Sequence, residues 1–311
     1  MAYLLGFGKY LPARVVGNEE IASLLGVEAS WIVEMSGISE RRYAGDEETV
    51  VEMAVRAGED ALERSGTQAG DLGVVLVSSG SSERRFPGPA AETANRLGAN
   101  GAVAIDVPMA SAGSLFAMAH AELWAGRVKK ILVIAAEKMS SIAMTEPREK
   151  GTAMLFGDGA GACVLSADSG RARIVDFVLG SDGSSAGELK LEFGKPVAMN
   201  GRMVIMHAAR KVPAAIQTVL QRTGVNASEI RVFLMHQANA NLITKIAQSI
   251  GVEPGIFYSN IQRYGNTSSA SMLIAAEEWQ ATSGGLKANE KAVFAAFGAG
   301  FHWGAMLVEG V

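Results

Sequence analysis

Apolar residues recur along the first half of the chain with two periods, one typical of helices and one of buried strands. The pattern predicts helices over 49–65 and 112–125, and strands over 71–80, 103–107, 129–136 and 161–165. The segment KKILVIAA at 129–136 is apolar almost throughout, as expected for a strand that helices cover on both faces. This half therefore predicts a layered α/β unit.

The second half of the chain repeats this order of elements. It predicts helices over 207–223, 240–250 and 269–283, and strands over 232–236, 292–297 and 304–308. Three pairs of segments are similar: VVLVSSG and VFLMHQA, ILVIAAE and AVFAAFG, and GACVL and GAMLV. We therefore expect a gene duplication, with domains 1–168 and 169–311 packed face to face and a binding site in the cleft between them.

Composition excludes several classes of function. Lys and Arg total 28 against 32 Asp and Glu, a net charge of −4, which argues against a broad basic surface for nucleic acid. No apolar run approaches the roughly 18 residues of a membrane span, and no secretory pattern opens the chain, so we expect a cytoplasmic protein. The single cysteine, Cys163, excludes an internal disulfide and is interpreted as a small buried residue. With four scattered histidines, we expect no metal site.

Two polar segments of the second half are candidates for chemistry. His236, in MHQAN, ends a predicted buried strand, and Asn266, in YGNTSS, precedes a predicted helix. Asn266 can point its side-chain amide at the space that His236 faces, at the end of the predicted strand. The alternatives are a hydrogen-bonded core histidine and a helix-capping turn.

Ser111 is the candidate nucleophile of the first half. It lies in DVPMASAG, between a predicted buried strand and a long helix, where free amides at the helix start favour negative charge. The alternative is that Ser111 only caps the helix. The glycines of FGAGFHWG at 297–304 allow bare backbone amides to approach a ligand.

Together these segments resemble the β-ketoacyl-acyl-carrier-protein synthase III family of the thiolase-like superfamily. The resemblance covers nearly the whole chain and rests on motifs in the family's order: YLP at 10–12, WIV at 31–33, SGI at 36–38, FP at 86–87, DVPMASAG at 106–113, FGDGAGA at 156–162, HQAN at 236–239, YGNTSSAS at 264–271 and GAGFHWGAMLV at 298–308. It implies a thiolase-like, five-layered α-β-α-β-α fold of two duplicated βαβαβαββ halves, usually a homodimer.

The resemblance also implies a reaction. The family transfers an acyl group from coenzyme A onto the enzyme and condenses it with a malonyl thioester on acyl-carrier protein, releasing carbon dioxide. Its substrates are these thioesters, and no further cofactor is implied. We therefore expect an acyltransferase of fatty-acid or polyketide biosynthesis, with acyl-CoA and acyl-carrier protein as partners.

The site residues follow from the same motifs. His236 and Asn266 match the family's catalytic pair, and the backbone amides of Ser111 and Gly300 match its oxyanion hole. Ser111 stands where the family has cysteine. A serine needs a base, here His236, and an acyl-serine is a less electrophilic ester, so we expect slower condensation and relatively more acyl transfer or hydrolysis.

The substrate-binding positions match only in part. Trp31 matches the residue that stacks on the adenine of coenzyme A. In the Lys150-Gly151 segment, the lysine keeps a cation where the family commonly has arginine. Asn239 completes the HQAN motif, and Phe86 lies in the region that caps the acyl pocket in the family.

Two cations of the family's binding region are missing. Met35 and Asn241 replace arginines that contact phosphate and carrier protein. Other arginines lie nearby in the sequence and are interpreted as exposed surface: Arg41, Arg42, Arg84 and Arg85. The replacements weaken the expectation of tight binding to phosphates or an acidic carrier.

Two alternatives to an active enzyme stay open. A chain that has lost the thiol is also expected of a noncatalytic partner subunit, and of an engineered Cys-to-Ser variant of a condensing synthase. The unusual Pro108 and Met109 beside the nucleophile favour natural divergence.

Overall fold

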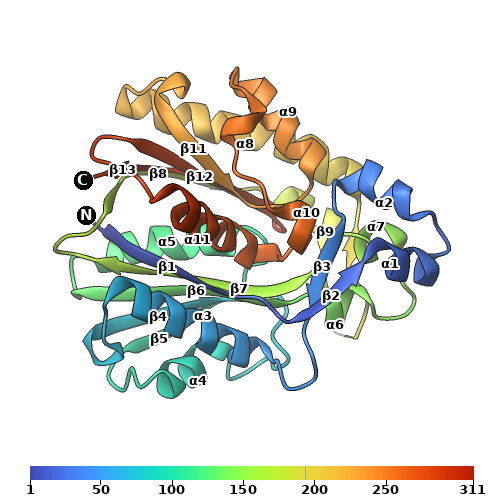
Figure 1. Cartoon of the computed structure of the whole chain (residues 1–311), viewed down its shortest axis with the longest axis horizontal. Helices are drawn as coiled ribbons and strands as arrows, with labels where there is room; N and C mark the ends of the chain where they lie inside the picture. Colours follow the sequence, from blue (N-terminus) through green and yellow to red (C-terminus); the bar gives the residue numbers. More distant parts are fainter. Residues whose placement is uncertain (193) are drawn as a thin grey trace.

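A mixed nine-stranded sheet forms the frame of the molecule. The computed structural model describes residues 1–192 and 194–311. Across these residues the strand order is β11 (Ile230–Met235), β12 (Lys291–Gly298), β13 (His302–Gly310), β8 (Ala172–Ser181), β1 (Tyr3–Tyr10), β7 (Asp158–Ser166), β6 (Lys130–Lys138), β4 (Leu72–Ser78) and β5 (Val103–Val107). Only two residue pairs join β1 to β8. The sheet turns there into two half-sheets, one above the other in Figure 1.

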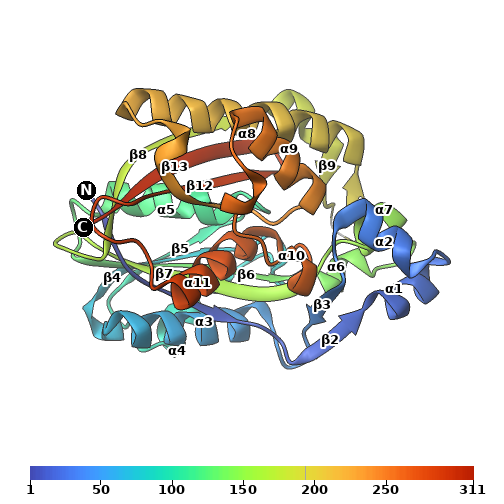
Figure 2. The same ribbon diagram turned by 45° about the horizontal axis from the view of Figure 1, so that its top comes forward.

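Helices separate and cover the two half-sheets. Between them lie α5 (Gly113–Trp124) and α11 (Ser271–Ser283), which contact strands of both. The outer face of one half-sheet carries α8 (Gly201–Thr223) and α9 (Ala240–Ile250), and that of the other carries α3 (Val50–Ser65) and α4 (Pro89–Arg96) (Figures 1 and 2). The five-layered α-β-α-β-α order predicted from the resemblance is confirmed.

The two halves share one topology. In each, a parallel strand (β4 or β11) pairs with β6 or β12, which is antiparallel to β7 or β13. The three similar pairs of sequence segments therefore occupy equivalent strands. The counterpart of β5 is reduced to a single parallel bridge between Phe233 and Phe257. The domain boundary at 168/169 falls between β7 and β8 and stays a prediction.

Capping residues set the helix boundaries. Thr49 Oγ1 accepts a hydrogen bond from the Glu52 amide at 3.1 Å where α3 begins. Gly66 ends the helix in the left-handed backbone conformation, with a φ of 64°. The predicted helix over 49–65 is thus confirmed. By contrast, α8 begins six residues before the predicted 207, because Asn200 caps it at Gly201.

Several elements were not predicted from the pattern. They are β1 and β8, a two-stranded antiparallel sheet of β2 (Arg14–Gly17) and β3 (Glu40–Tyr43), β9 (Leu189–Lys190) with β10 (Ala198–Met199), and the helices α1 (Asn18–Leu25), α2 (Ala29–Ser36), α6 (Ser140–Ala143), α7 (Lys150–Ala153) and α10 (Ile261–Tyr264). In β1 the glycines hide the strand pattern. A Cβ at Gly8 would lie 2.2 Å from the Ala61 nitrogen, so glycine lets α3 lie against the strand.

The core contains the single cysteine. Cys163 is fully buried on β7, and burial raises the pKa of its thiol. The prediction of a small buried residue is confirmed. Within the described residues, no helix is long and apolar enough to cross a bilayer.

Candidate active site

Ser111 lies on a strained turn between β5 and α5. Its φ is +61°, unusual for a residue other than glycine, and its side chain is almost buried. The N-cap of α5 is Ala112 and no side chain caps it, so the interpretation of Ser111 as a helix cap is wrong. The Ser111 amide donates to Ser268 Oγ at 2.9 Å, whereas its hydroxyl has no hydrogen bond within the described residues. The turn therefore presents a free hydroxyl.

The end of β12 supports this turn. A Cβ at Gly298 would lie 2.4 Å from the Ala110 carbonyl oxygen and 3.0 Å from Ser111 Cβ, so only glycine fits. Gly300, the predicted second oxyanion donor, lies against the His302 ring and does not line the cavity. The structure thus brings Gly298, rather than Gly300, against the nucleophile, and an oxyanion role for Gly300 stays a prediction.

His236 follows β11 and is held by Ser271. The Ser271 hydroxyl donates to the Ser268 carbonyl at 3.0 Å and accepts the Gln237 amide at 3.0 Å. His236 Nδ1 lies 2.7 Å from the same oxygen and therefore donates to it, which leaves the lone pair on Nε2. Burial lowers the pKa of His236 to about 4, so the imidazole is neutral near pH 7.

Asn266 is oriented by its own turn. Its Oδ1 accepts the Ser268 amide at 2.9 Å, and its backbone pairs with Leu155 and Gly157. The amide group Nδ2 has no partner within residues 1–192 and 194–311, and so remains free to donate. The N-cap of α11 is Ala270, so Asn266 does not cap that helix.

A buried carboxylate connects this turn to the other half of the molecule. Glu137, at the end of β6, accepts hydrogen bonds from the amide and hydroxyl of Ser269, at 3.2 and 2.6 Å. Its second oxygen accepts from Ser79, Gly80 and Ser81. These five hydrogen bonds satisfy both oxygens of the side chain, which forms no ion pair within the described residues.

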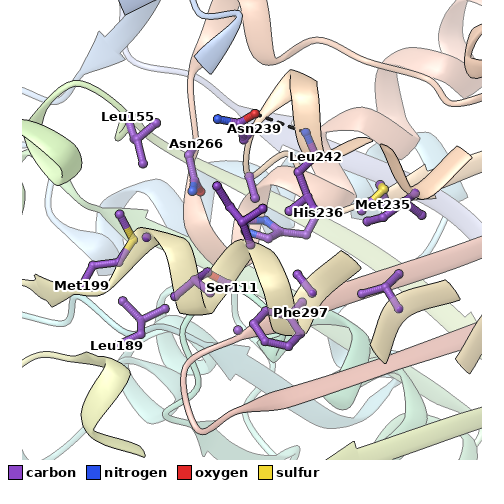
Figure 3. Close-up of a pocket in the computed structure, with 18 of the residues that line it drawn as sticks. Ser111, Leu155, Leu189, Met199, Met235, His236, Asn239, Leu242, Asn266 and Phe297 are labelled. Atoms are coloured by element: carbon purple, nitrogen blue, oxygen red, sulfur yellow. Dashed lines mark hydrogen bonds between the residues drawn. The ribbon is translucent and has the colours of Figure 1, made fainter. Parts of the chain in front are cut away.

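The three candidate catalytic residues meet at one cavity of about 710 Å³, its open mouth included. Figure 3 shows Ser111, His236 and Asn266 around the same space, with Asn239 near them. The other lining residues are apolar: Leu155, Phe156, Leu189, Met199, Gly201, Val204, Ile205, Ala208, Val212, Met235, Ala238, Leu242, Ile246, Phe297 and Gly298.

The remaining predicted binding residues lie outside this cavity. Trp31 is half-buried on α2, Lys150 and Gly151 are exposed on α7, and the Phe86 side chain is 85% exposed. Of the predicted binding residues, the structure brings only Asn239 to the cavity.

The two positions that lack the family's arginines are neighbours. Asn241 Nδ2 donates to the Glu34 carbonyl at 3.0 Å, and Asn239 Nδ2 donates to the Met35 carbonyl at 2.8 Å. These bonds tie the start of α9 to the end of α2, so this rim of the cavity is neutral and closely held.

The interpretation of the four other arginines needs one correction. Arg41 is not surface: it is fully buried and donates to Asn18 Oδ1 and to the Met154 carbonyl, both at 2.7 Å. Arg42 is half-buried over the Tyr264 ring, while Arg84 and Arg85 are exposed, as predicted.

The sequence motifs contained supporting residues that their pattern did not identify. Ser268, Ser269 and Ser271 lie in the YGNTSSAS segment, where three hydroxyls in four residues were a usable signal. Glu137 ends an apolar strand, and a carboxylate there indicates a buried hydrogen-bonded network. The apolar lining of α8 gave no signal that separates a cavity wall from a core face.

The assembled groups suit acyl transfer. A hydroxyl beside a neutral imidazole with a free Nε2 can be activated for attack, and a free amide donor can bind a carbonyl oxygen. The apolar walls exclude water from such a reaction.

Comparison with known proteins agrees with this geometry. Residues 105–183 match the family model of 3-oxoacyl-[acyl-carrier-protein] synthase III, and residues 220–310 match the model of its C-terminal part. The β-ketoacyl-[acyl-carrier-protein] synthase III of Listeria welshimeri is 34% identical over 310 residues, 99% of this chain and 98% of the relative. That of Ehrlichia ruminantium is 35% identical over 316 residues, 98% of each.

Solved structures give the same result. The 3-oxoacyl-[acyl-carrier-protein] synthase III of Aquifex aeolicus superimposes with a TM-score of 0.94 at 31% identity, covering 99% of this chain and 100% of that one. The priming β-ketosynthase of the R1128 polyketide pathway gives 0.91 at 30%, covering 100% and 96%. The chain therefore belongs to the β-ketoacyl-[acyl-carrier-protein] synthase III family of condensing acyltransferases.

Proposed function

We propose that this chain is a synthase III-type acyltransferase of fatty-acid or polyketide priming that carries the acyl group on Ser111. His236 Nε2 accepts the Ser111 proton as Oγ attacks the thioester carbonyl. The C–S bond breaks, and the departing thiolate takes the proton from Nε2, which leaves a free thiol and an acyl-serine. Asn266 Nδ2 donates to a carbonyl oxygen of the bound substrates.

One observation carries this proposal. Where these residues line the apolar cavity, the Ser111 hydroxyl, His236 Nε2 and Asn266 Nδ2 have no hydrogen-bond partner within the described residues. The Ser111 amide, His236 Nδ1 and Asn266 Oδ1 are hydrogen-bonded. All three atoms belong to residues that line the cavity, so they are open to a bound substrate. A bound thioester supplies a carbonyl carbon for the hydroxyl to attack and a carbonyl oxygen for the amide donor, while Nε2 accepts the hydroxyl proton.

The second half of the reaction is expected to be slow. Loss of carbon dioxide from a malonyl thioester gives a carbanion that attacks the acyl carbonyl, and an oxygen ester is a poorer target than a thioester. A base with a pKa of about 4 is also weak, because proton transfer is most efficient when the pKa is near the working pH. Transfer to another nucleophile or to water therefore competes with condensation.

Unpaired cations beside the mouth of the cavity fit an acidic thioester carrier. Arg202, Arg210 and Lys245 are exposed and have no ion pair within the described residues. Ile205 lines both their groove and the cavity. These cations compensate for the neutral rim at Met35 and Asn241, so we include carrier protein, besides coenzyme A, among the donors.

Intact-protein mass after incubation with acetyl-, butyryl-, octanoyl- and malonyl-coenzyme A tests the proposal. We expect an acyl adduct located on Ser111 by peptide fragmentation, and none with Ser111→Ala. Ser111→Cys should accept the same acyl groups and condense them faster. Uptake by Ser111→Ala at the native rate would refute the role of Ser111.

The absence of both adduct and released coenzyme A would instead support a noncatalytic partner subunit. The hydrogen bond from the Ser111 amide to Ser268 Oγ favours that alternative, because it occupies an amide that an oxyanion needs. Copurification with a cysteine-containing relative would then be the next measurement.

The homodimer also remains a proposal. Strand β5 lies at an edge of the sheet with Val103 48% exposed, and exposed Phe86 is two residues before Gly88, which packs against Asp106 of β5. Pairing of this edge with a second copy would cover both. We expect sedimentation equilibrium to give a mass of twice the chain mass of 32.5 kDa.

A further inference from the structure

A second cavity lies at the end of the molecule that carries both chain termini (Figures 1 and 2). Its volume is about 470 Å³, its open mouth included, and it is lined by the first half of β1 and of β12, the C-terminal end of α11 and the loop that follows α11. The Ser111 cavity lies at the other end of α11, where Ser271 contacts His236. Because the 13 residues of α11 span about 20 Å and no lining residue is common to both, the two cavities are separate.

The walls of this second cavity are apolar, and three of them are aromatic. Phe7, Phe294 and the half-buried Trp279 line it, and the two phenylalanine rings stack with their centroids 6.1 Å apart. The aliphatic residues around the rings include Leu4, Leu234, Leu286 and Val308. Walls that meet no side chain forfeit dispersion contacts, which a ligand with an apolar body restores. A flat ring suits aromatic walls best, since stacking adds to the burial of area.

Two polar side chains of the second cavity have no protein partner. Arg171 is exposed and forms no ion pair or side-chain hydrogen bond within residues 1–192 and 194–311. The Gln280 side-chain amide has no hydrogen bond within the same residues. A planar guanidinium binds a carboxylate through two parallel hydrogen bonds, and an amide nitrogen adds a further donor. The two side chains therefore suit one carboxylate at the mouth, with the body of the ligand inside.

The neighbouring charges favour a single negative charge on the ligand. Arg171 and Gln280 also line an adjoining hollow of about 550 Å³, together with Arg64 and Glu277. The buried Glu277 carboxylate lies 2.7 Å from Lys9 Nζ and 3.1 Å from an Arg64 nitrogen, so these two cations are already paired. The last carbonyl groups of α11 add partial negative charge at this end. A dianion would therefore meet negative charge without a second free cation among the lining residues.

We propose that this cavity is a second ligand site, which binds a small aromatic monocarboxylate. The carboxylate binds Arg171 and the Gln280 amide. The ring packs among Phe7, Trp279 and Phe294. The site is separate from acyl transfer and does not depend on a role for Ser111.

Photolabelling with 4-benzoylbenzoate tests the site directly. This probe is an aromatic monocarboxylate, and on irradiation its benzophenone inserts into nearby C–H bonds. We expect peptide fragmentation to locate the label in residues 279–286 or beside Arg171, and saturating acetyl-coenzyme A to leave this label unchanged. A label found only in residues that line the Ser111 cavity, or scattered over the exposed surface, would overturn the proposal.

The requirement for charge is measured by protection of the same peptide from labelling. 4-Phenylbutyrate should protect it at about a tenfold lower concentration than the neutral 4-phenylbutanamide, as expected when a hydrogen bond involves charged groups. Arg171→Gln should remove this difference. The matched control is Arg127→Gln, at another exposed arginine that lines neither hollow, and it should keep the difference. Equal protection by acid and amide in the native protein, or equal losses in the two variants, would overturn the proposal.

A third variant tests the space itself. Leu286→Trp fills the second cavity and should reduce labelling of residues 279–286 at least about tenfold, as expected when a ligand of this size loses its buried area. Leu123→Trp makes the same change at a side chain that is 71% exposed on α5 and should label as the native protein does. Native labelling of Leu286→Trp would contradict the site. Since Arg171 is exposed, Arg171→Gln remains a test even where Leu286→Trp does not fold.

The acyl adduct on Ser111 is measured in the same samples, so the two proposals fail separately. Label at residues 279–286 without any adduct would retain the second site and reject the transferase. An adduct without that label would retain the transferase and reject the second site.

Discussion

The ends of β6 and β12 are equivalent in the two halves, and each contacts the catalytic turn of the other half through a different kind of interaction. At the end of β6, Glu137 holds the turn before α11 through the two hydrogen bonds that it accepts from the Ser269 amide and hydroxyl. At the end of β12, Gly298 occupies the equivalent position and supports the turn before α5 by offering no side chain at all. The polar contact orients a turn that carries Asn266, whereas the close contact fixes a turn that carries the nucleophile. Two duplicated halves can thus keep the same backbone geometry while one positions a catalytic turn by hydrogen bonding and the other by close packing.

The largest expected effect comes from Gly298→Ala. The added Cβ must displace the Ala110–Ala112 backbone, and a shift of about 1 Å at a reacting atom costs about a hundredfold in rate. We expect acylation of Ser111 to fall by that factor, measured by released thiol. Gly255→Ala, with open space around it, is the control and should keep the native rate. A native rate in Gly298→Ala would show that close packing is not what positions the nucleophile.

Ser271→Ala should have the next largest effect. It removes the acceptor of the His236 Nδ1 proton and of the Gln237 amide, so Nε2 no longer keeps its lone pair toward the cavity. Loss of such an orienting partner typically costs 10–100-fold, and the pH profile of acylation should also change. Ser271→Thr retains the hydroxyl and should restore both; Ser249→Ala, on exposed α9, is the control.

Glu137→Gln should reduce stability more than rate. The amide replaces one acceptor oxygen by a donor, which leaves buried hydroxyls and amides of the serine turns unpaired. We expect the free energy of unfolding to fall by about 2 kcal/mol and acylation to fall less than tenfold. Urea unfolding measures the first, with exposed Glu47→Gln as control. A hundredfold loss of rate at native stability would contradict this division.

The smallest effect concerns pH. With its pKa lowered to about 4, His236 stays neutral down to about pH 5, so acylation should change less than twofold between pH 8 and 5.5. An unperturbed histidine, with pKa near 6.5, would lose about tenfold over that range. The lowered pKa of His236 also makes the free energy of unfolding fall as the pH drops from about 6.5 to 4. In this range His236 binds a proton in the unfolded chain but stays neutral in the folded one. A midpoint near 6.5 in the rate profile would show that the imidazole is solvated.

Sequence periodicity predicted the strands that carry the site, because β4, β6 and β11 are apolar on both faces. It failed at β1, where Gly8 allows close contact with α3, a tertiary cause that no local pattern contains. The motifs predicted Ser111, His236 and Asn266 as a group, whereas the burial of Arg41 and the exposure of Phe86 depend on neighbours distant in sequence. The cavity wall on α8 was equally hidden, since an apolar helix face has the same sequence pattern whether it packs against other side chains or lines a cavity.

The burial of Cys163 has a practical consequence. Its thiol is inaccessible and has a raised pKa, so alkylating reagents should leave the folded protein unmodified. Ser111→Cys would then hold the one reactive sulfur in the molecule, free of background labelling. Its rate of alkylation against pH would report the ionisation of a thiol at the start of α5, and a substrate that occupies the cavity would slow that alkylation.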